Sequence, residues 1–477
     1  MNRNRAIFVA LSGASLPFVL FAKRNDYFHY DENVSVDLTC QMEGEPLPLT
    51  LSLNQTSYKW RPPLPEVRQF NLSKAVQKEN VTYCLPKKDN VIQIMVNIHP
   101  DSLFDIKRGI YTVGKFKYLT HLKSIFDYWH EKGNYTNRGT DSERMAKVYL
   151  NSNEALDLGL KIKGNATRSY PQKSLKLKCR ADFGNGKMEN DWFSDSLKKY
   201  ESLILSTSGN DLVKGTMREP FSQLVSKRLN IFTYPWRYSE LYINGEYWGL
   251  HFVSPKVDAA YLEDILDEQE IYILEDLLLF YKGEVSLFED FLARYKVFNR
   301  LVSMSMEELS KLVSIESLVD YTLIETFANN QDWPTHNIRA FGIKDAPIQF
   351  ILNDLDLGWG IGPNNEVFQV LKNEDSFFSK LLGHAMELKE FRTLLFNRYK
   401  ELARSTISVE SLAEKLDSME TEQELLMPQQ IMRWRTHSSI QDWKNEVNVI
   451  REFIKERHSI YNKELLEFIE YYEHKAH

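Results

Sequence analysis

The hydrophobic pattern of the chain changes from strand-like alternation to helix-like spacing. In the first half, short apolar runs such as Val91–Ile98 stand between polar stretches. The clearest pair, Tyr238–Ile243 and Glu246–Phe252, is joined by Asn244-Gly245, which is typical of a two-residue type I′ hairpin turn. From about residue 288 onward, apolar residues recur mainly at spacings of three and four. The pattern predicts an α+β fold with a β-rich N-terminal lobe and a mostly helical C-terminal lobe.

Three segments carry most of the helical pattern of the second half. They are Phe377–Ser405, Val409–Leu416 and Ile440–Tyr472. The last segment has a predicted apolar stripe, which comprises Trp443, Val447, Ile450, Phe453, Ile454 and Tyr461. A stripe of this kind is typical of a helix that packs one face against a core.

The stretch from Ser314 to Gly362 joins a helical pattern to a strand pattern. It opens with an expected amphipathic helix, whose stripe is Ile315, Leu318, Val319, Leu323 and Phe327. A polar loop, Asn329–Asn337, follows. Two apolar runs, Ile338–Ile343 and Ile348–Leu352, then flank a turn and lead into an acidic loop. If the runs form a hairpin, four side chains are expected at one end of it: Asp332, Asn337, Asp354 and Asp356.

These four side chains have the composition of a magnesium–phosphate site. Mg²⁺ prefers oxygen ligands and usually takes only one or two protein carboxylates. Asp332 and Asn337 have the D-x-x-x-x-N spacing of a kinase catalytic loop, and Asp356-Leu357-Gly358 stands where a kinase has its second acidic loop. On spacing alone, the alternative is that these residues only form turns and caps.

A second candidate site lies earlier in the chain. The loop Gly164–Pro171 leads into Gln172–Arg180, an alternating strand that would place Lys173 near phosphate groups bound by the loop. Arg218, before the helix expected over Phe221–Leu229, could reach a phosphate or an acidic side chain. The alternative is an edge strand with solvated lysines.

The chain as a whole predicts export. Residues 1–24 have basic residues, then an uncharged run and a charged end, which is typical of a signal peptide or an N-terminal anchor.

Residues 25–92 are interpreted as a small β-rich appendage and 93–477 as the main domain. In an exported protein Cys40 and Cys84 could pair, leaving Cys179; otherwise all three are thiols. A net charge of −7 does not favour nucleic-acid binding.

Eight segments, in order, resemble the CotH-type kinases, the family of spore-coat kinase homologues. They are HPDSLFDIKRGIYTVG, NYTNRGTDSERMAKV, KGNATRSYPQKSLKLKCR, STSGNDLVKGTMRE, ELYINGEYWGLHF, NQDWPTHN, NDLDLGWG and a C-terminal IMRWR…W…IREFIKER. Together they extend over about residues 91–470. The resemblance implies a two-lobed, atypical protein-kinase-like fold that uses ATP with Mg²⁺, or with Mn²⁺ as the alternative metal.

The resemblance also implies a role for each candidate residue. Asp332 would orient and deprotonate the acceptor hydroxyl, and Lys173 would pair with the nucleotide phosphates. The metal would be held by Asn337, Asp354 and Asp356, and Arg168 and Arg218 would contact phosphate or support the structure. Where family members commonly carry a Glu after the hairpin, this chain has Pro255, which raises the alternative of a pseudokinase.

The leading hypothesis is therefore an exported protein kinase that transfers the γ-phosphoryl group of ATP to Ser or Thr of secreted or surface proteins. The membrane would be involved only through an N-terminal anchor. One alternative is a catalytically weak protein that acts as a nucleotide-binding, coat or surface structural protein. Another is a metal-dependent phosphohydrolase or a glycan-binding surface protein.

Overall fold

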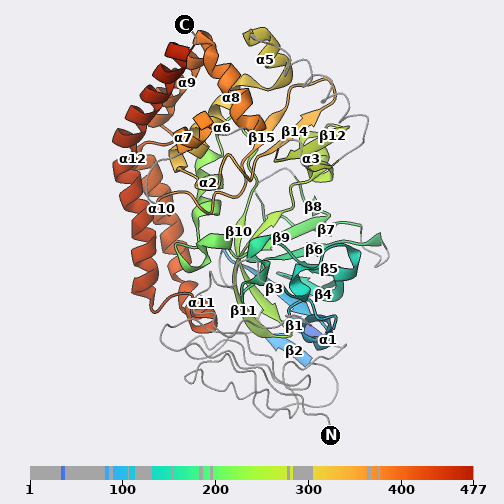
Figure 1. The fold of residues 1–477 in the computed structure, drawn as a ribbon. Helices are drawn as coiled ribbons and strands as arrows, with labels where there is room; N and C mark the ends of the chain where they lie inside the picture. The colour runs from blue at the N-terminus through green and yellow to red at the C-terminus, as the bar shows by residue number, and fades with distance from the viewer. Residues whose placement is uncertain are drawn as a thin grey trace. The chain divides into compact units, whose positions relative to one another are not determined.

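The computed structural model describes most of the chain from residue 90 onward. The described residues are 34–37, 81–84, 90–105, 107–112, 132–152, 154–181, 186–193, 197–276, 280–282, 305–361, 367–373 and 376–475. Sheets and helices are both prominent, so the predicted α+β class is confirmed. The chain divides into two compact units (Figure 1). One unit comprises residues 1–213, 236–256 and 423–443, and the other comprises 214–235, 257–422 and 444–477.

The first unit is built around a closed barrel of seven strands. In spatial order these are β10 (Arg237–Ile243), β11 (Glu246–Pro255), β9 (Ser202–Ser206), β6 (Leu175–Lys178), β5 (Ala155–Ile162), β4 (Arg144–Leu150) and β3 (Ile92–Asn97). Neighbouring strands are antiparallel except β10 and β3, which pair in parallel and close the barrel. Closure removes the exposed edges that an open sheet would leave. The sequence pattern did not predict a barrel.

The hairpin of β10 and β11 has the turn that its sequence predicted. Asn244 and Gly245 both have positive φ, 48° and 79°, as a type I′ turn requires. Helix α11 (Met427–Trp434) caps this hairpin with side-chain hydrogen bonds to its main chain. Arg433 Nε donates to Tyr247 O at 2.8 Å, and Trp434 Nε1 donates to Trp248 O at 2.7 Å.

Three small elements complete the first unit. Helix α1 (Pro100–Phe104) follows β3, and strands β7 (Met188–Glu189) and β8 (Lys199–Tyr200) form a separate antiparallel pair. Strands β1 (Val34–Asp37) and β2 (Val81–Cys84) form a parallel pair in the predicted appendage. The appendage boundary and the Cys40–Cys84 disulfide remain predictions, because Cys40 lies outside the described residues. Cys179 is a free, buried thiol.

The second unit combines a four-stranded antiparallel sheet with helices. The sheet order is β13 (Phe280–Lys282), β12 (Ile271–Glu275), β14 (Arg339–Ile343) and β15 (Gln349–Ile351). The helices are α2 (Arg218–Ser226), α3 (Ala259–Leu266), α5 (Met306–Leu312), α6 (Ile315–Ala328), α7 (Val367–Asn373), α8 (Phe377–Glu387), α9 (Lys389–Ala403), α10 (Val409–Glu424) and α12 (Ile440–Lys475). The hairpin predicted after Asn337 is present as β14 and β15.

Helix α6 differs from the amphipathic helix that its sequence predicted. Every residue of α6 except Glu316 is buried, so the helix has no solvated face. Its polar residues are accommodated because they find partners. Asp320 pairs with Arg398 through contacts of 2.7 and 2.9 Å, and Thr326 Oγ1 lies 2.8 Å from the Tyr461 hydroxyl. Paired polar groups can be buried at little cost, which a stripe of apolar residues does not reveal.

Two further points concern the helices. The segment predicted over Phe377–Ser405 is two helices, because Leu388 adopts an extended conformation and separates α8 from α9. None of the helices in the described residues is long and apolar enough to cross a membrane. The predicted signal peptide or anchor, residues 1–24, lies outside the described part of the chain.

Candidate functional site

The loop after α6 places Asp332 in the second unit. Asn329 ends the helix in a left-handed conformation with φ of 55°. Trp333 is then buried, with its Nε1 donating to the Tyr321 hydroxyl at 3.1 Å. The loop closes on itself, because the His336 N–H and the Thr335 hydroxyl both donate to Asp332 O, at 3.0 and 2.9 Å. The position of Asp332 is thus fixed from both sides.

Asp332 and Asn337, which the sequence predicted to act together, are in direct contact. Asn337 Nδ2 donates to Asp332 Oδ2 at 2.7 Å. The other carboxyl oxygen, Oδ1, is buried and has no hydrogen-bond partner within the described part of the chain. A buried acceptor without a donor costs free energy, so this oxygen is suited to a ligand that brings a proton or a positive charge.

The carboxyl group of Asp332 has an unusual acidity. Burial raises its pKa, and the charges of Asp354 and Asp276 raise it further, to about 7; the hydrogen bond from Asn337 acts in the opposite direction. A pKa near 7 is suited to a group that must accept a proton at neutral pH. Asp354 is therefore close enough to influence Asp332 electrostatically, as expected for residues at one end of the hairpin.

The acidic loop after β15 is tied to the Asp332 loop by main-chain hydrogen bonds. The Trp359 N–H donates to Ala328 O at 2.7 Å, and the Gln331 N–H donates to Leu357 O at 3.3 Å. Asp354 is exposed and has a left-handed backbone with φ of 66°, whereas Asp356 is buried. The two predicted metal ligands of this loop thus have different environments.

The acidic environment includes three residues that the sequence pattern did not identify: Glu219, Asp276 and Glu325. Asp276 follows directly after β12, and its charge raises the pKa of Asp332. Glu325, on α6, is fully buried; burial raises its pKa well above the usual range, and the charges of Asp332 and Glu219 add to this. The position of Asp276 just after the short apolar run Ile271–Leu274 was the one available signal.

The acidic side chains that the structure describes do not form a closed metal cage. Within the described residues, no three side chains of the His, Cys, Asp or Glu type are arranged to hold a metal ion. Mg²⁺ does not need such a cage, because it commonly binds one or two carboxylates together with water and phosphate oxygens. The exposed carboxylate of Asp354 fits a site of that open kind, while the unpartnered oxygen of Asp332 is left to accept a proton.

Arg218 is placed in the second unit as well, where it supports the acidic loop. Its side chain is buried at the start of α2, and Nε donates to Gly358 O at 3.0 Å. Of the two roles predicted for Arg218, this contact matches the structural one. Its predicted contact with phosphate remains a prediction.

Lys173 belongs to the first unit, where its ammonium group is buried. Nζ donates to Arg168 O at 2.7 Å and to Tyr170 O at 2.8 Å, and it lies 3.9 Å from the centre of the Tyr135 ring. Burial and the neighbouring Arg168 charge lower its pKa well below the usual range. In this structure Lys173 therefore fastens its own glycine-containing loop, and its pairing with nucleotide phosphates remains a prediction.

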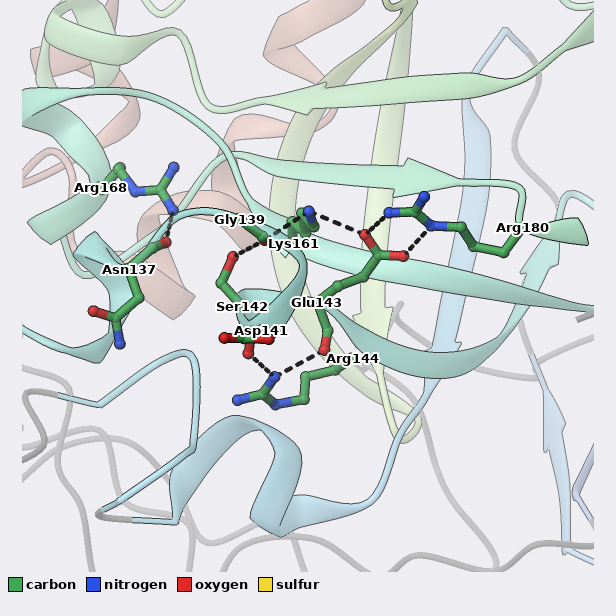
Figure 2. A network of polar contacts seen from close by, with 9 residues as sticks. All are labelled: Asn137, Gly139, Asp141, Ser142, Glu143, Arg144, Lys161, Arg168 and Arg180. Carbon is green, nitrogen blue, oxygen red and sulfur yellow. Dashed lines mark hydrogen bonds and ion pairs between the residues drawn. The ribbon is translucent and has the colours of Figure 1, made fainter. Parts of the chain in front are cut away.

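Arg168 holds a neighbouring loop by its main chain. Nε donates to Tyr135 O at 2.7 Å and Nη2 to Asn137 O at 2.9 Å (Figure 2). Burial and the charge of Arg138 lower the Arg168 pKa to about 10. The same loop is held further along by Lys161, whose Nζ donates to Gly139 O at 2.8 Å. Arg168 and Lys161 thus hold this loop through its carbonyl oxygens.

Glu143 provides the main acidic counterpart in this network. Its carboxylate accepts two hydrogen bonds of 2.6 Å from Arg180 and lies 3.1 Å from Lys161 Nζ (Figure 2). Arg144 completes the network, with Nη1 donating to Asp141 O at 2.7 Å. The network fixes the loop over residues 137–143 to strand β5 through Lys161 and to Arg180, which follows β6.

Pro255, the position at which family members commonly carry a Glu, is the last residue of β11 and pairs with Leu203. It supplies no carboxylate to the first unit. The nearest acidic residue after it, Asp258, accepts a hydrogen bond from Tyr261 N at 3.3 Å and caps α3.

Comparison with known proteins assigns the chain to a family. The family described as CotH kinase protein matches residues 160–461, which is well over half of the chain. The match includes Lys173 and both loops of the acidic site. No curated protein matches the chain. The chain belongs to the CotH kinase family.

Proposed function

We propose that the protein is an exported atypical protein kinase that transfers the γ-phosphoryl group of ATP to Ser or Thr of secreted or surface proteins. The observation that carries the proposal is Asp332, a carboxyl group with an unpartnered buried oxygen and a pKa raised to about 7 by burial and by Asp354. The pair formed with Asn337 at D-x-x-x-x-N spacing supports the same interpretation. A two-lobed, kinase-like arrangement of the two units is part of this proposal.

In the proposed reaction, Asp332 accepts the proton of the acceptor hydroxyl. The hydroxyl oxygen forms a bond to the γ-phosphorus of ATP, the bond from that phosphorus to the β–γ bridging oxygen breaks, and ADP leaves. Asn337, Asp354 and Asp356 are the residues that would hold Mg²⁺, or Mn²⁺ in its place. When bound, the metal neutralises phosphate charge. Asn337 orients the Asp332 carboxylate through its 2.7 Å hydrogen bond, so that the free oxygen faces the hydroxyl.

Phosphoryl transfer by the purified full chain tests the proposal. We expect label from γ-labelled ATP to appear on Ser or Thr, either of the chain itself or of dephosphorylated casein, when Mg²⁺ is present and not when EDTA replaces it. No incorporation with Mg²⁺ or with Mn²⁺ would contradict the proposal.

The alternative is a pseudokinase that binds nucleotide as a coat or surface structural protein. Two points favour it: the resemblance implies a Glu at the position where this chain has Pro255, and the Lys173 ammonium group is occupied by main-chain carbonyls. This alternative predicts that ATP raises the melting temperature although no label is incorporated. The two readouts on one sample therefore separate the two functions.

A further inference from the structure

Helix α2 holds the acidic loop of the second unit by four side chains spread over its first two turns. Each contact is a hydrogen bond: Gln223 Nε2 to Leu352 O at 3.0 Å, Glu219 Oε2 from Leu355 N at 2.6 Å, Arg218 Nε to Gly358 O at 3.0 Å, and Ser222 Oγ from Trp359 Nε1 at 2.7 Å. Three of them reach main-chain atoms. The helix therefore holds the path of this loop mainly through its main chain.

Glu219 makes the contact closest to the proposed chemistry. Leu355, whose N–H it binds, lies between Asp354 and Asp356. The Glu219 carboxylate also accepts hydrogen bonds from the Tyr234 hydroxyl at 2.5 Å and from Gln223 Nε2 at 2.9 Å. An ionised carboxylate only accepts hydrogen bonds, so it can meet all three donors at once.

The backbone beside this contact needs support. Asp354 has a φ of 66°, in the left-handed region, which an aspartate adopts more readily than most residues but still at some cost. The hydrogen bond from the adjacent Leu355 N–H to Glu219 is short, at 2.6 Å, and it involves a charged acceptor, which makes it one of the stronger kinds. Loss of the negative charge at Glu219 would therefore free the main chain between the exposed Asp354 and the buried Asp356.

We infer that Glu219 is a positioning residue of the phosphoryl-transfer site, which fixes the Leu355 main chain and thereby the directions of Asp354 and Asp356. The inference rests on the proposed function, because it assigns these two aspartates to the metal. Groups that orient metal ligands typically change metal affinity or activity by about 10- to 100-fold when they are removed.

The substitution Glu219→Gln tests the inference with little change in size. A glutamine places an NH2 group against one of the donors that now face Glu219. We expect the Mg²⁺ concentration for half-maximal transfer to rise about tenfold or more. Tyr234→Phe removes one donor without changing the net charge, and we expect a smaller rise in the same direction. Glu410→Gln, at an exposed position in the first turn of α10, is the matched control and should leave the Mg²⁺ dependence unchanged.

Amide hydrogen exchange of the peptide containing Leu355, without metal or ATP, provides a second readout. We expect faster exchange in Glu219→Gln than in the wild type. If Glu219 only stabilised the fold, the melting temperature would fall while the half-maximal Mg²⁺ concentration stayed the same, and the inference would be wrong. If exchange accelerates but the wild type transfers no phosphoryl group, the positioning of the loop stands and the proposed kinase function fails.

Discussion

Around the Gly164 loop of the barrel unit, basic side chains donate to main-chain carbonyls. Lys173 and Arg168 are both buried there, and both have lowered pKa values. Around the Asp332 loop of the second unit, burial and the charges of Asp354 and Asp276 raise the pKa of Asp332 to about 7, and one of its oxygens has no partner in the described residues. The basic groups are thus satisfied without a ligand, whereas Asp332 is not. The comparison indicates that a bound ligand would change the hydrogen bonds and charges of the acidic loops more than those of the Gly164 loop.

The largest effect is expected from removing the proton acceptor. Asp332→Asn keeps the shape of the side chain but cannot accept a proton at neutral pH. We expect the rate of phosphoryl transfer to fall by about 10²- to 10⁴-fold, the usual contribution of a general base. Label incorporation from γ-labelled ATP measures it.

Asp345→Asn is the matched control for this substitution. Asp345 is exposed in the turn between β14 and β15, and its positive φ of 61° suits asparagine equally well. The control should transfer at the wild-type rate. If the Asp332→Asn variant were as active as this control, Asp332 would not be the proton acceptor. The contrast between the acidic loop and the Gly164 loop would then have no functional meaning.

The same carboxyl group should make stability depend on pH. The pKa of Asp332 is about 7 in the folded state, whereas an unperturbed aspartate has a pKa of 3.8. Between these pH values the folded protein therefore binds more protons than the unfolded chain. Its stabilising contribution is therefore complete below pH 3.8 and is lost as the pH rises through 7. By linkage, the wild type should lose up to about 4 kcal/mol of unfolding free energy relative to Asp332→Asn over this range.

Urea unfolding of the wild type and Asp332→Asn at pH 5 and pH 8 measures this difference. We expect the free energy of unfolding of the variant to rise relative to that of the wild type as the pH increases. The substitution that removes the proton acceptor should therefore improve stability at alkaline pH. Parallel pH profiles of the unfolding free energy for the two proteins would show that the surroundings of Asp332 do not raise its pKa.

How well the sequence predicted a feature of these two regions depends on the sequence separation of the residues that form it. The Asn244-Gly245 turn and the β14–β15 hairpin depend on adjacent residues, and both are present as predicted. The contact of Asp332 with Asn337 lies within one loop, and the D-x-x-x-x-N spacing indicated it. Local sequence determines local geometry, and these features are local.

Contacts between distant segments could not be predicted in the same way. The closure of the barrel depends on β3 pairing with β10, and neither strand carries a signal for the other. Glu219 binds Leu355 N from a helix far earlier in the chain, and an acidic residue in a first helical turn is ordinary in itself. The burial of α6 depends on Arg398 and Tyr461 of other helices. Side-chain partners decide these features, and their identity emerges only from the fold.

A smaller effect is expected from Lys173→Met. The methionine fills a similar volume but leaves Arg168 O and Tyr170 O without the ammonium donor, which should cost about 2–3 kcal/mol of unfolding free energy. If Lys173 also pairs with nucleotide phosphates, ATP should no longer raise the melting temperature of the variant. Lys178→Met, at the end of the strand β6 that follows Lys173, is the matched control.

The outcome bears directly on the comparison of the two units. A folded Lys173→Met variant that retains the full ATP-dependent shift would mean that the lysine only fastens its loop. The predicted role in nucleotide binding would then be wrong, and the first unit would take part in binding through other groups.

The smallest effect is expected from Glu143→Gln. Burial acts to raise the pKa of Glu143, but Arg180 and Lys161 outweigh it and the pKa lies below its usual range. A lowered folded-state pKa means that the stabilisation is present above about pH 4.5 and is lost as the pH falls. Because this carboxylate remains partly open to water, the substitution should cost only about 1 kcal/mol at pH 7, as measured by urea unfolding.

Glu143→Gln and Glu219→Gln make the same chemical change at a loop anchor in each unit. Both glutamates accept short hydrogen bonds, of 2.6 Å, but the donors are Arg180 in one case and the Leu355 N–H in the other. We expect Glu143→Gln to lower stability at neutral pH without changing the Mg²⁺ dependence of transfer, because Glu143 holds a loop to strands of the barrel. A rise in the half-maximal Mg²⁺ concentration equal to that of Glu219→Gln would contradict the division of roles between the units.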